Sequence, residues 1–105
     1  MNDSDESGLL PYKVTLFQNY PNPFNLCTLI KYRVSNQTTN KISLKIYNIL
    51  GNEVRTLVDA NQNEGEYQFL WDGKDVSGTD VSSGFYFYTL KNGNSVYSKK
   101  MMLIR

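Results

Sequence analysis

Residues 41–47 read KISLKIY, and this stretch has the clearest periodicity in the chain. Ile42, Leu44 and Ile46 alternate with polar residues, so every second side chain is apolar. A period of two is typical of a β-strand with one buried face and one solvated face. The stretch therefore predicts a strand that packs one side on a core and leaves its lysines in water.

Six further runs on both sides of this strand also have strand character. The seven expected strands cover residues 12–18, 28–34, 41–47, 53–59, 66–71, 85–91 and 95–104. Many short strands separated by frequent turn signals are typical of an all-β sandwich or barrel. In residues 85–91 the alternation places Tyr86, Tyr88 and Leu90 on the inner face and Phe85 and Phe87 on the outer face.

Local irregularities and turns also have sequence signals. Val54, Leu57 and Val58 fit helical spacing as well as strand spacing, and we interpret this run as a strand with a bulge. Gly51 allows a tight loop after the strand at 41–47. Residues 91–94, KNGN, predict a hairpin with a type I′ turn, because Asn-Gly is the preferred pair for that turn.

Length and composition exclude several classes of function. The 105 residues suffice for one domain, and 11 Lys and Arg against 10 Asp and Glu lack the basic excess of nucleic-acid-binding domains. The sequence has no His, which removes imidazole bases and ligands, and its one cysteine, Cys27, has no neighbouring base. We expect a protein that is no enzyme, needs no cofactor or metal, and has no membrane-spanning segment.

The acidic, polar residues 1–8 are interpreted as a linker or an artificial end, and residues 9–105 as the domain. They do not have the order of a secretory signal peptide. If the protein is exported, we expect its signal to lie elsewhere than in this N-terminal piece.

The loop after residue 71 contains Asp72, Asp75 and Asp80, which raises the question of a calcium site. Their spacing does not fit an EF-hand and no bidentate Glu follows, so we favour a connection held by Asx-turns with Gly at positive φ. Exposed aromatic residues on a sandwich could instead stack on sugars. Phe85, Phe87 and Tyr97 are the better candidates for exposure, although packing within the sheet is the simpler interpretation.

Two segments have the most distinctive composition. Residues 19–25 read NYPNPFN, whose two prolines predict a stiff, non-helical connection with Phe24 as its anchor to the core. Residues 97–105 read YSKKMMLIR, a basic pair followed by apolar residues and a final Arg. The simple interpretation is the last strand of the sandwich, and the functional one is an address read by a receptor.

These segments, together with LKIYNILGNEV at 44–54, WDG at 71–73, Gly78, SGFY at 83–86 and KMML at 100–103, resemble the type A C-terminal sorting domains of the type IX secretion system of Bacteroidetes. The stretch from WDG to SGFY is shared with the immunoglobulin-like domain of the flagellar hook-capping family and discriminates less. The sequence departs from the sorting-domain pattern at Leu26 and Cys27, where Pro and Ser are common.

The resemblance implies an immunoglobulin-like antiparallel β-sandwich of about seven strands, joined to an N-terminal passenger in its precursor. Such domains are recognised by the outer-membrane translocon and cut off by a cell-surface sortase, so the implied location is the cell surface or medium, reached through the periplasm. The alternative is a structural or carbohydrate-binding accessory module of the hook-cap type. A weak homodimer through the last strand is left open.

The site residues fall into two groups. The candidates for recognition by the translocon are Gly84, Tyr86, Lys99, Lys100, Met101, Leu103 and Arg105. The candidates for a structural motif are Tyr20, Pro21, Asn22, Pro23, Phe24, Asn25, Trp71, Asp72 and Gly73.

Overall fold

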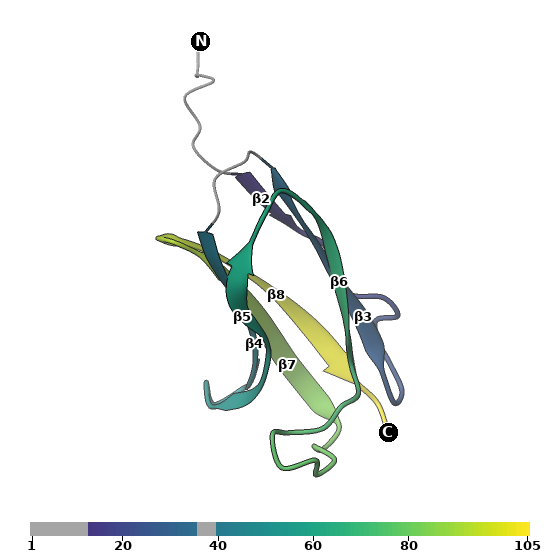
Figure 1. Cartoon of the computed structure of the whole chain (residues 1–105). Helices are drawn as coiled ribbons and strands as arrows, with labels where there is room; N and C mark the ends of the chain where they lie inside the picture. Colours follow the sequence, from purple (N-terminus) through teal and green to yellow (C-terminus); the bar gives the residue numbers. More distant parts are fainter. Residues whose placement is uncertain (1–12, 36–39) are drawn as a thin grey trace.

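The computed structural model describes residues 13–35 and 40–105, which form two antiparallel sheets packed face to face (Figure 1). One sheet has the order β2-β3-β6, with β2 at Lys13–Leu16, β3 at Thr28–Ser35 and β6 at Gly65–Trp71. The other has the order β5-β4-β7-β8, with β5 at Glu53–Gln62, β4 at Asn40–Asn48, β7 at Gly84–Asn92 and β8 at Ser95–Leu103.

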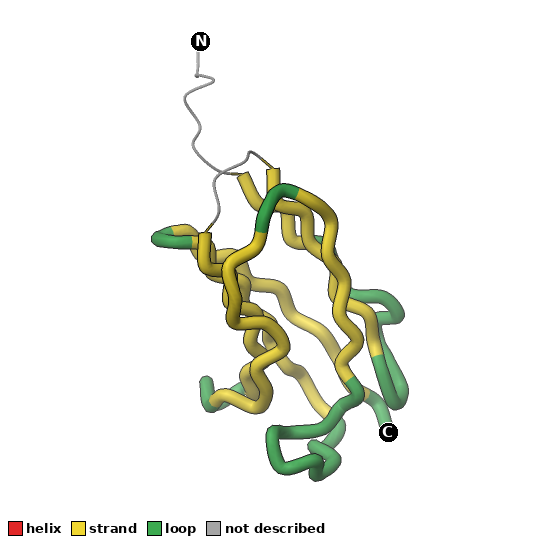
Figure 2. Tube along the Cα trace, in the orientation of Figure 1, coloured by secondary structure: helices red, strands yellow, loops and turns green. Residues whose placement is uncertain are grey.

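The expected immunoglobulin-like sandwich of seven strands is thereby confirmed, each expected strand matching one in the structure. The described residues consist of strands and loops alone (Figure 2). They include no helix that is long and apolar enough to cross a membrane. The interpretation of residues 1–8 as a linker lies outside the described residues, as does the expected strand start at residue 12.

Alternation along the strands builds the core between the two sheets. Ile42, Leu44 and Ile46 are each 0% exposed, and they face the buried positions of β3 and β6. In β7 the expected inner and outer faces are confirmed, because Tyr88 and Leu90 are fully buried while Phe85 is 42% exposed. Burying such side chains contributes roughly 1.5–3 kcal/mol each, so this alternation is the main source of the fold's stability.

The irregularity expected in β5 is present. The register between β4 and β5 shifts between Leu44 and Lys45 and again between Ile46 and Tyr47. At each shift β5 contains one extra residue, Leu57 and Val54 respectively. The bulge at Leu57 lets the adjacent Leu57 and Val58 both pack against the core, which explains the break in the period-two alternation of this strand.

The hairpin predicted between the last two strands is present, but the predicted type I′ turn was wrong. Asn92 pairs with Ser95, so the two-residue loop is Gly93-Asn94 rather than Asn92-Gly93. Gly93 has a φ of +60°, and Leu26 is the only non-glycine with positive φ among the described residues. Gly at the first loop position with an Asn of negative φ at the second fits a type II′ turn. The pairing register places the glycine first.

A long connection, residues 17–27, joins β2 to β3, and Tyr88 of the opposite sheet fixes it to the core. The Tyr88 hydroxyl donates to the carbonyl of Phe17 at 2.7 Å and accepts from the backbone N–H of Asn19 at 2.8 Å. Burial raises the pKa of Tyr88 to about 12, so the hydroxyl keeps its proton for this bond. Near the end of the connection Leu26 has a φ of +79°, which the ring of a proline could not adopt.

Candidate functional site

Four segments that are distant in the sequence meet at one end of the sandwich, where β6 and β8 end and β7 begins (Figure 1). We call this region the motif end, and it consists of residues 20–25, 71–73, 84–86 and 99–105. All the candidate residues predicted from the sequence belong to it. The Tyr20 backbone pairs with Leu29, which fixes the start of the first segment beside β3.

The segment 20–25 pairs with the outer edge of the last strand. Phe24 forms a parallel bridge with Leu103, its N–H donating to the carbonyl of Met102 and its carbonyl accepting from Ile104, both at 2.9 Å. The Asn22 side chain accepts from the N–H of Met102 at 3.0 Å. The peptide bonds before Pro21 and Pro23 are both cis. This part of the β8 edge is therefore covered, and a second copy could pair with it only by displacing the segment.

Below this bridge lies an aromatic cluster. Phe24, as expected, is an anchor, with 1% of its surface exposed and its ring centroid 5.7 Å from that of Trp71. Trp71 also contacts Tyr86 edge to face at 5.5 Å, and its indole N–H donates to the carbonyl of Lys74 at 2.9 Å. The Tyr86 hydroxyl donates to the Ser82 carbonyl, and burial raises its pKa. The cluster thus packs the segment 20–25 against β6 and β7.

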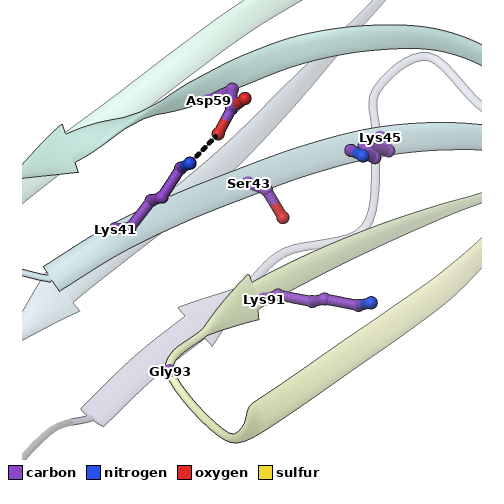
Figure 3. A pocket seen from close by; sticks show the side chains of 6 residues that line it. All are labelled: Lys41, Ser43, Lys45, Asp59, Lys91 and Gly93. Carbon is purple, nitrogen blue, oxygen red and sulfur yellow. Dashed lines mark ion pairs between the residues drawn. The ribbon is translucent and has the colours of Figure 1, made fainter.

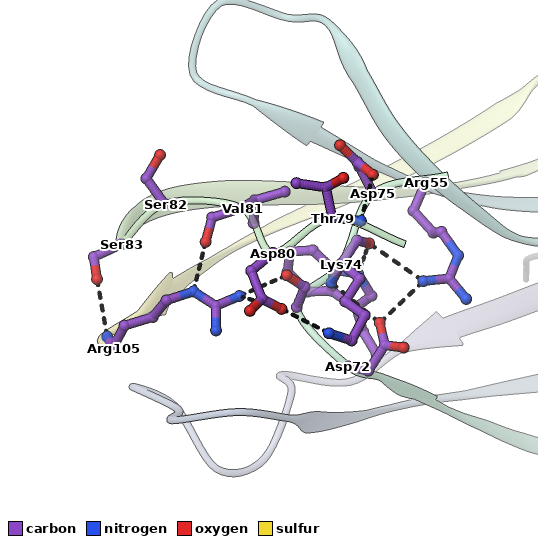
Figure 4. Close-up of polar contacts among 12 residues, drawn as sticks. Arg55, Asp72, Lys74, Asp75, Thr79, Asp80, Val81, Ser82, Ser83 and Arg105 are labelled. Atoms are coloured by element: carbon purple, nitrogen blue, oxygen red, sulfur yellow. Dashed lines mark hydrogen bonds and ion pairs between the residues drawn. The ribbon is translucent and has the colours of Figure 1, made fainter. Parts of the chain in front are cut away.

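Arg105 connects the last strand to the loop between β6 and β7 (Figure 4). Its guanidinium donates to the carbonyls of Val81 at 2.6 Å and Gly73 at 2.7 Å, and its backbone N–H donates to the Ser83 hydroxyl. A carboxylate oxygen of Asp80 lies 3.7 Å from the guanidinium. Sequence reasoning predicted Arg105 as part of an address and did not predict that it would bind this loop.

Gly73 is required by this arrangement. It has a φ of +72°, and a Cβ placed there would lie 2.9 Å from the Arg105 guanidinium and 3.2 Å from the Leu26 carbonyl. The backbone conformation and the lack of space both favour glycine. Gly84, at the start of β7, also has a positive φ, of +149°, but open space surrounds it.

The carboxylates of the loop are used in turns and ion pairs. Asp72 accepts from the N–H of Lys74, and Asp75 accepts from those of Ser77 and Thr79, which confirms the expected Asx-turns. Asp72 also pairs with Arg55 at 3.0 Å. The hydrogen bond and charge of Lys74, with the charge of Arg105, lower the pKa of Asp80. No three His, Cys, Asp or Glu residues of the described ranges gather as a metal site.

The recognition candidates divide into buried and accessible residues. Tyr86, Met101 and Leu103 are 6%, 1% and 0% exposed, so a receptor that reads the folded domain cannot contact these side chains. Lys100 lies on the outer face opposite Phe87, whereas Lys99 lies on the inner side opposite the buried Tyr88. Alternation along β8 thus sends the two lysines to opposite faces, and they do not form the basic pair that their adjacency indicated.

The outer-face aromatics do not form a platform. The Lys100 ammonium lies 4.7 Å from the Phe85 ring centroid, Phe87 is half-buried, and Tyr97 packs against the core instead of facing outward. Phe85 lines two neighbouring hollows. One, of about 310 Å³, also includes Ile49 and Leu50, and the other, of about 210 Å³, includes Pro23 and Met102.

A further hollow of about 360 Å³ lies on the outer face of the four-stranded sheet, nearer the β7–β8 turn (Figure 3). Lys41, Lys45 and Lys91 surround the Ser43 side chain there. Lys41 pairs with Asp59 at 3.2 Å, within the hollow. The sequence pattern placed Lys41 and Lys45 on the wet face but gave no signal that Lys91 of another strand would join them.

The fold and the motif end define an immunoglobulin-like β-sandwich module. Residues 30–96 match the family model described as the FlgD Ig-like domain, and the chain belongs to that family. No curated protein matches the chain.

Solved structures with a similar fold include PorU of Porphyromonas gingivalis, in its dimeric latent form, with 17% identity over 94% of this chain and a TM-score of 0.71. PorZ of the same organism, an essential bacterial surface component of its type-IX secretion system, has 21% identity over 86% of this chain and a TM-score of 0.55. This chain covers 10% of the PorU chain and 11% of the PorZ chain, so the likeness concerns one domain of each.

Proposed function

We propose that this chain is a non-catalytic sorting domain that directs a passenger protein through the type IX outer-membrane translocon and is then removed by a cell-surface sortase. One observation carries the proposal. The FlgD Ig-like match covers residues 30–96, and the two elements that resemble sorting domains most specifically, at 20–25 and 99–105, lie on either side of it. These two elements contact each other directly, through the bridge between Phe24 and Leu103.

This contact supports the proposal because an immunoglobulin-like core does not itself require it. The segment 20–25 reaches across to the opposite sheet and fixes the last strand at Met102 and Ile104 through backbone hydrogen bonds. A receptor that reads the folded domain thus meets a surface made by both elements together. The type-IX association of PorZ agrees with this role, although its likeness to the chain concerns fold.

The test is export of a reporter. The full chain, residues 1–105, is fused to the C-terminus of a periplasm-directed fluorescent protein in a bacterium that has the type IX machinery. We expect the reporter on the cell surface or in the medium, without the domain, and in the periplasm of a strain that lacks the translocon. In a sortase-deficient strain the domain should remain attached.

The FlgD Ig-like domain, fused at the same place, is the matched control and should leave the reporter in the periplasm. If this chain folds in the fusion but also leaves the reporter in the periplasm, the proposal is wrong. If the FlgD domain is exported equally well, recognition does not depend on the two flanking elements.

A further inference from the structure

The first two residues of β7 have an open backbone edge. Gly84 and Phe85 pair with Leu103 and Met102 of β8, but β4 accompanies β7 only as far as the pair between Asn48 and Tyr86. Beyond that pair the chain of β4 turns away into the hairpin loop at 49–52, and no described strand takes its place. An unpaired strand edge is a site where another chain can add a strand.

Apolar side chains line the space beside this edge. Ile49 and Leu50, at the hairpin loop, are 70% and 80% exposed, and with Gly84 and Phe85 they line the hollow of about 310 Å³. Phe85 separates this hollow from the one next to Pro23. Exposed large apolar residues are unremarkable singly, but three around one hollow beside an open strand edge mark an interaction surface.

One positive charge lies over this apolar surface. The Lys100 ammonium is 4.7 Å from the centroid of the Phe85 ring. It forms no ion pair with any carboxylate of the described residues, in contrast to Lys41 and Lys45, which pair with Asp59 and Glu53. A cation above an apolar groove favours a partner that brings a carboxylate, because charge complementarity selects and orients partners at interfaces.

We propose that this surface, the Phe85 groove, formed by Ile49, Leu50, Gly84, Phe85, Met102 and Lys100, is where an extended segment of the export machinery docks. The segment pairs with the open backbone edge of Gly84 and Phe85, places an apolar side chain against Leu50, and offers a carboxylate to Lys100. This inference rests on the proposed function and names the partner's chemistry.

The test uses the reporter fusion with substitutions confined to exposed side chains. Leu50→Ser and Phe85→Ser should each reduce the exported fraction at least about tenfold, the loss expected when an anchoring side chain is removed from an interface. The matched controls are Leu70→Ser and Val76→Ser, which are 60% and 85% exposed and lie outside the groove. They should change export by no more than about twofold.

The charge is tested separately at the same surface. Lys100→Glu should reduce export strongly while Lys100→Arg preserves it, because only the first places like charges together. Lys91→Glu is the control and should leave export unchanged. Lys91 lies on the same face of the sheet, in the hollow that it shares with Lys41 and Lys45. Equal losses from Lys100→Glu and Lys91→Glu would show a general need for positive charge and overturn the acidic partner.

Folding and self-association are checked on the purified full-length variants. Each should melt within about 8 °C of wild type, the shift that about 1 kcal/mol produces in a domain of this size.

If the folded Leu50→Ser and Phe85→Ser variants are exported at the wild-type level, the groove proposal is wrong while the sorting function stands. If ultracentrifugation shows a wild-type dimer that Leu50→Ser converts to monomer, the groove holds a second copy and the proposal is overturned. If wild type is not exported, the sorting function fails and the groove proposal falls with it.

Discussion

The hairpin of β7 and β8 is stabilised differently at its tip and at its base. At the tip, Asn92 pairs with Ser95 across the turn Gly93-Asn94 and with Ile42 of β4, so only the turn itself lies outside the sheet pairing. At the base, segment 20–25 pairs with β8 and Arg105 binds the loop between β6 and β7. The tip and the base lie at opposite ends of the sandwich (Figure 1).

The last strand therefore depends on distant parts of the chain mainly at its base. A change at Gly93 or Asn94, the two residues of the turn, should act on the hairpin alone, since a two-residue turn sets its own geometry. A change at the base should also affect other segments. Phe24 packs on Trp71 and pairs with Leu103, and Arg105 binds the carbonyl of Gly73, the second residue after Trp71. The surface proposed for recognition lies at the base, so its shape depends on residues up to 80 positions away in the sequence.

The largest expected difference comes from removing the centre of the base. Trp71→Ala should lower the free energy of unfolding by about 3–5 kcal/mol, because it opens a cavity between Phe24 and Tyr86 and removes the bond to the Lys74 carbonyl. Val96→Ala, at the 57% exposed tip position, should cost less than about 0.5 kcal/mol. Urea denaturation of both variants measures the two changes in the free energy of unfolding. Similar losses would show that the base contributes no more to stability than the tip.

Substitution of two glycines compares base and tip directly, with an expected loss of stability between the largest and the smallest. Gly73 at the base and Gly93 at the tip have positive φ values of +72° and +60°, but only the first is crowded, by Arg105 and Leu26. Gly93→Ala should therefore cost about 1–2 kcal/mol from backbone conformation alone. Gly73→Ala should cost about 1–3 kcal/mol more, since the added methyl must displace its neighbours.

Adding Arg105→Ala to Gly73→Ala separates the crowding by the Arg105 guanidinium from the crowding by the Leu26 carbonyl. The guanidinium contact disappears while the Leu26 carbonyl stays, so part of the extra cost should vanish in the double variant. Thermal and urea denaturation of the single and double variants provide the cycle. Equal costs for Gly73→Ala and Gly93→Ala would contradict the crowding at the base.

The same contrast explains what the sequence could and could not predict. Period-two alternation located the strands and the inner face of β7, because each strand buries its own side chains. Phe24 and the Asx-turns were predictable for the same local reason. The type of the Gly93-Asn94 turn was missed because it depends on pairing register, which one residue can shift.

The base was beyond prediction because its contacts join distant residues. Nothing in the sequence around Arg105 indicates that its guanidinium will meet Gly73 and Val81, and nothing around Asn22 indicates Met102. Adjacency also misled: Lys99 and Lys100 looked like one basic pair, yet a strand directs them to opposite faces. The resemblance placed the motifs in order along the chain, and the structure places them in contact.

The smallest expected effect concerns the ion pairs of the base. In the folded chain the hydrogen bond and charge of Lys74, with the charge of Arg105, hold the pKa of Asp80 below its ordinary value of 3.8. A lowered folded pKa means that the stabilisation is present above pH 3.8 and is lost as the pH falls through the folded pKa. Because these pairs are exposed, solvent screens them and the effect on global stability should be slight.

The effect should nevertheless be visible locally, and only at the base. A carbon-detected NMR titration should show the Asp80 carboxylate protonating with a midpoint below 3.8, and the amide signals of Gly73 and Val81 should shift with the same midpoint. Arg105→Met should raise that midpoint, and Lys74→Met should raise it further, because Lys74 makes the larger contribution. Gly93 at the tip should not follow this titration, since its hairpin contacts involve no Asp80. A midpoint at or above 3.8 would show that Arg105 and Lys74 do not hold the loop through this carboxylate, and that Arg105 binds the loop through its bonds to Gly73, Val81 and Ser83 alone.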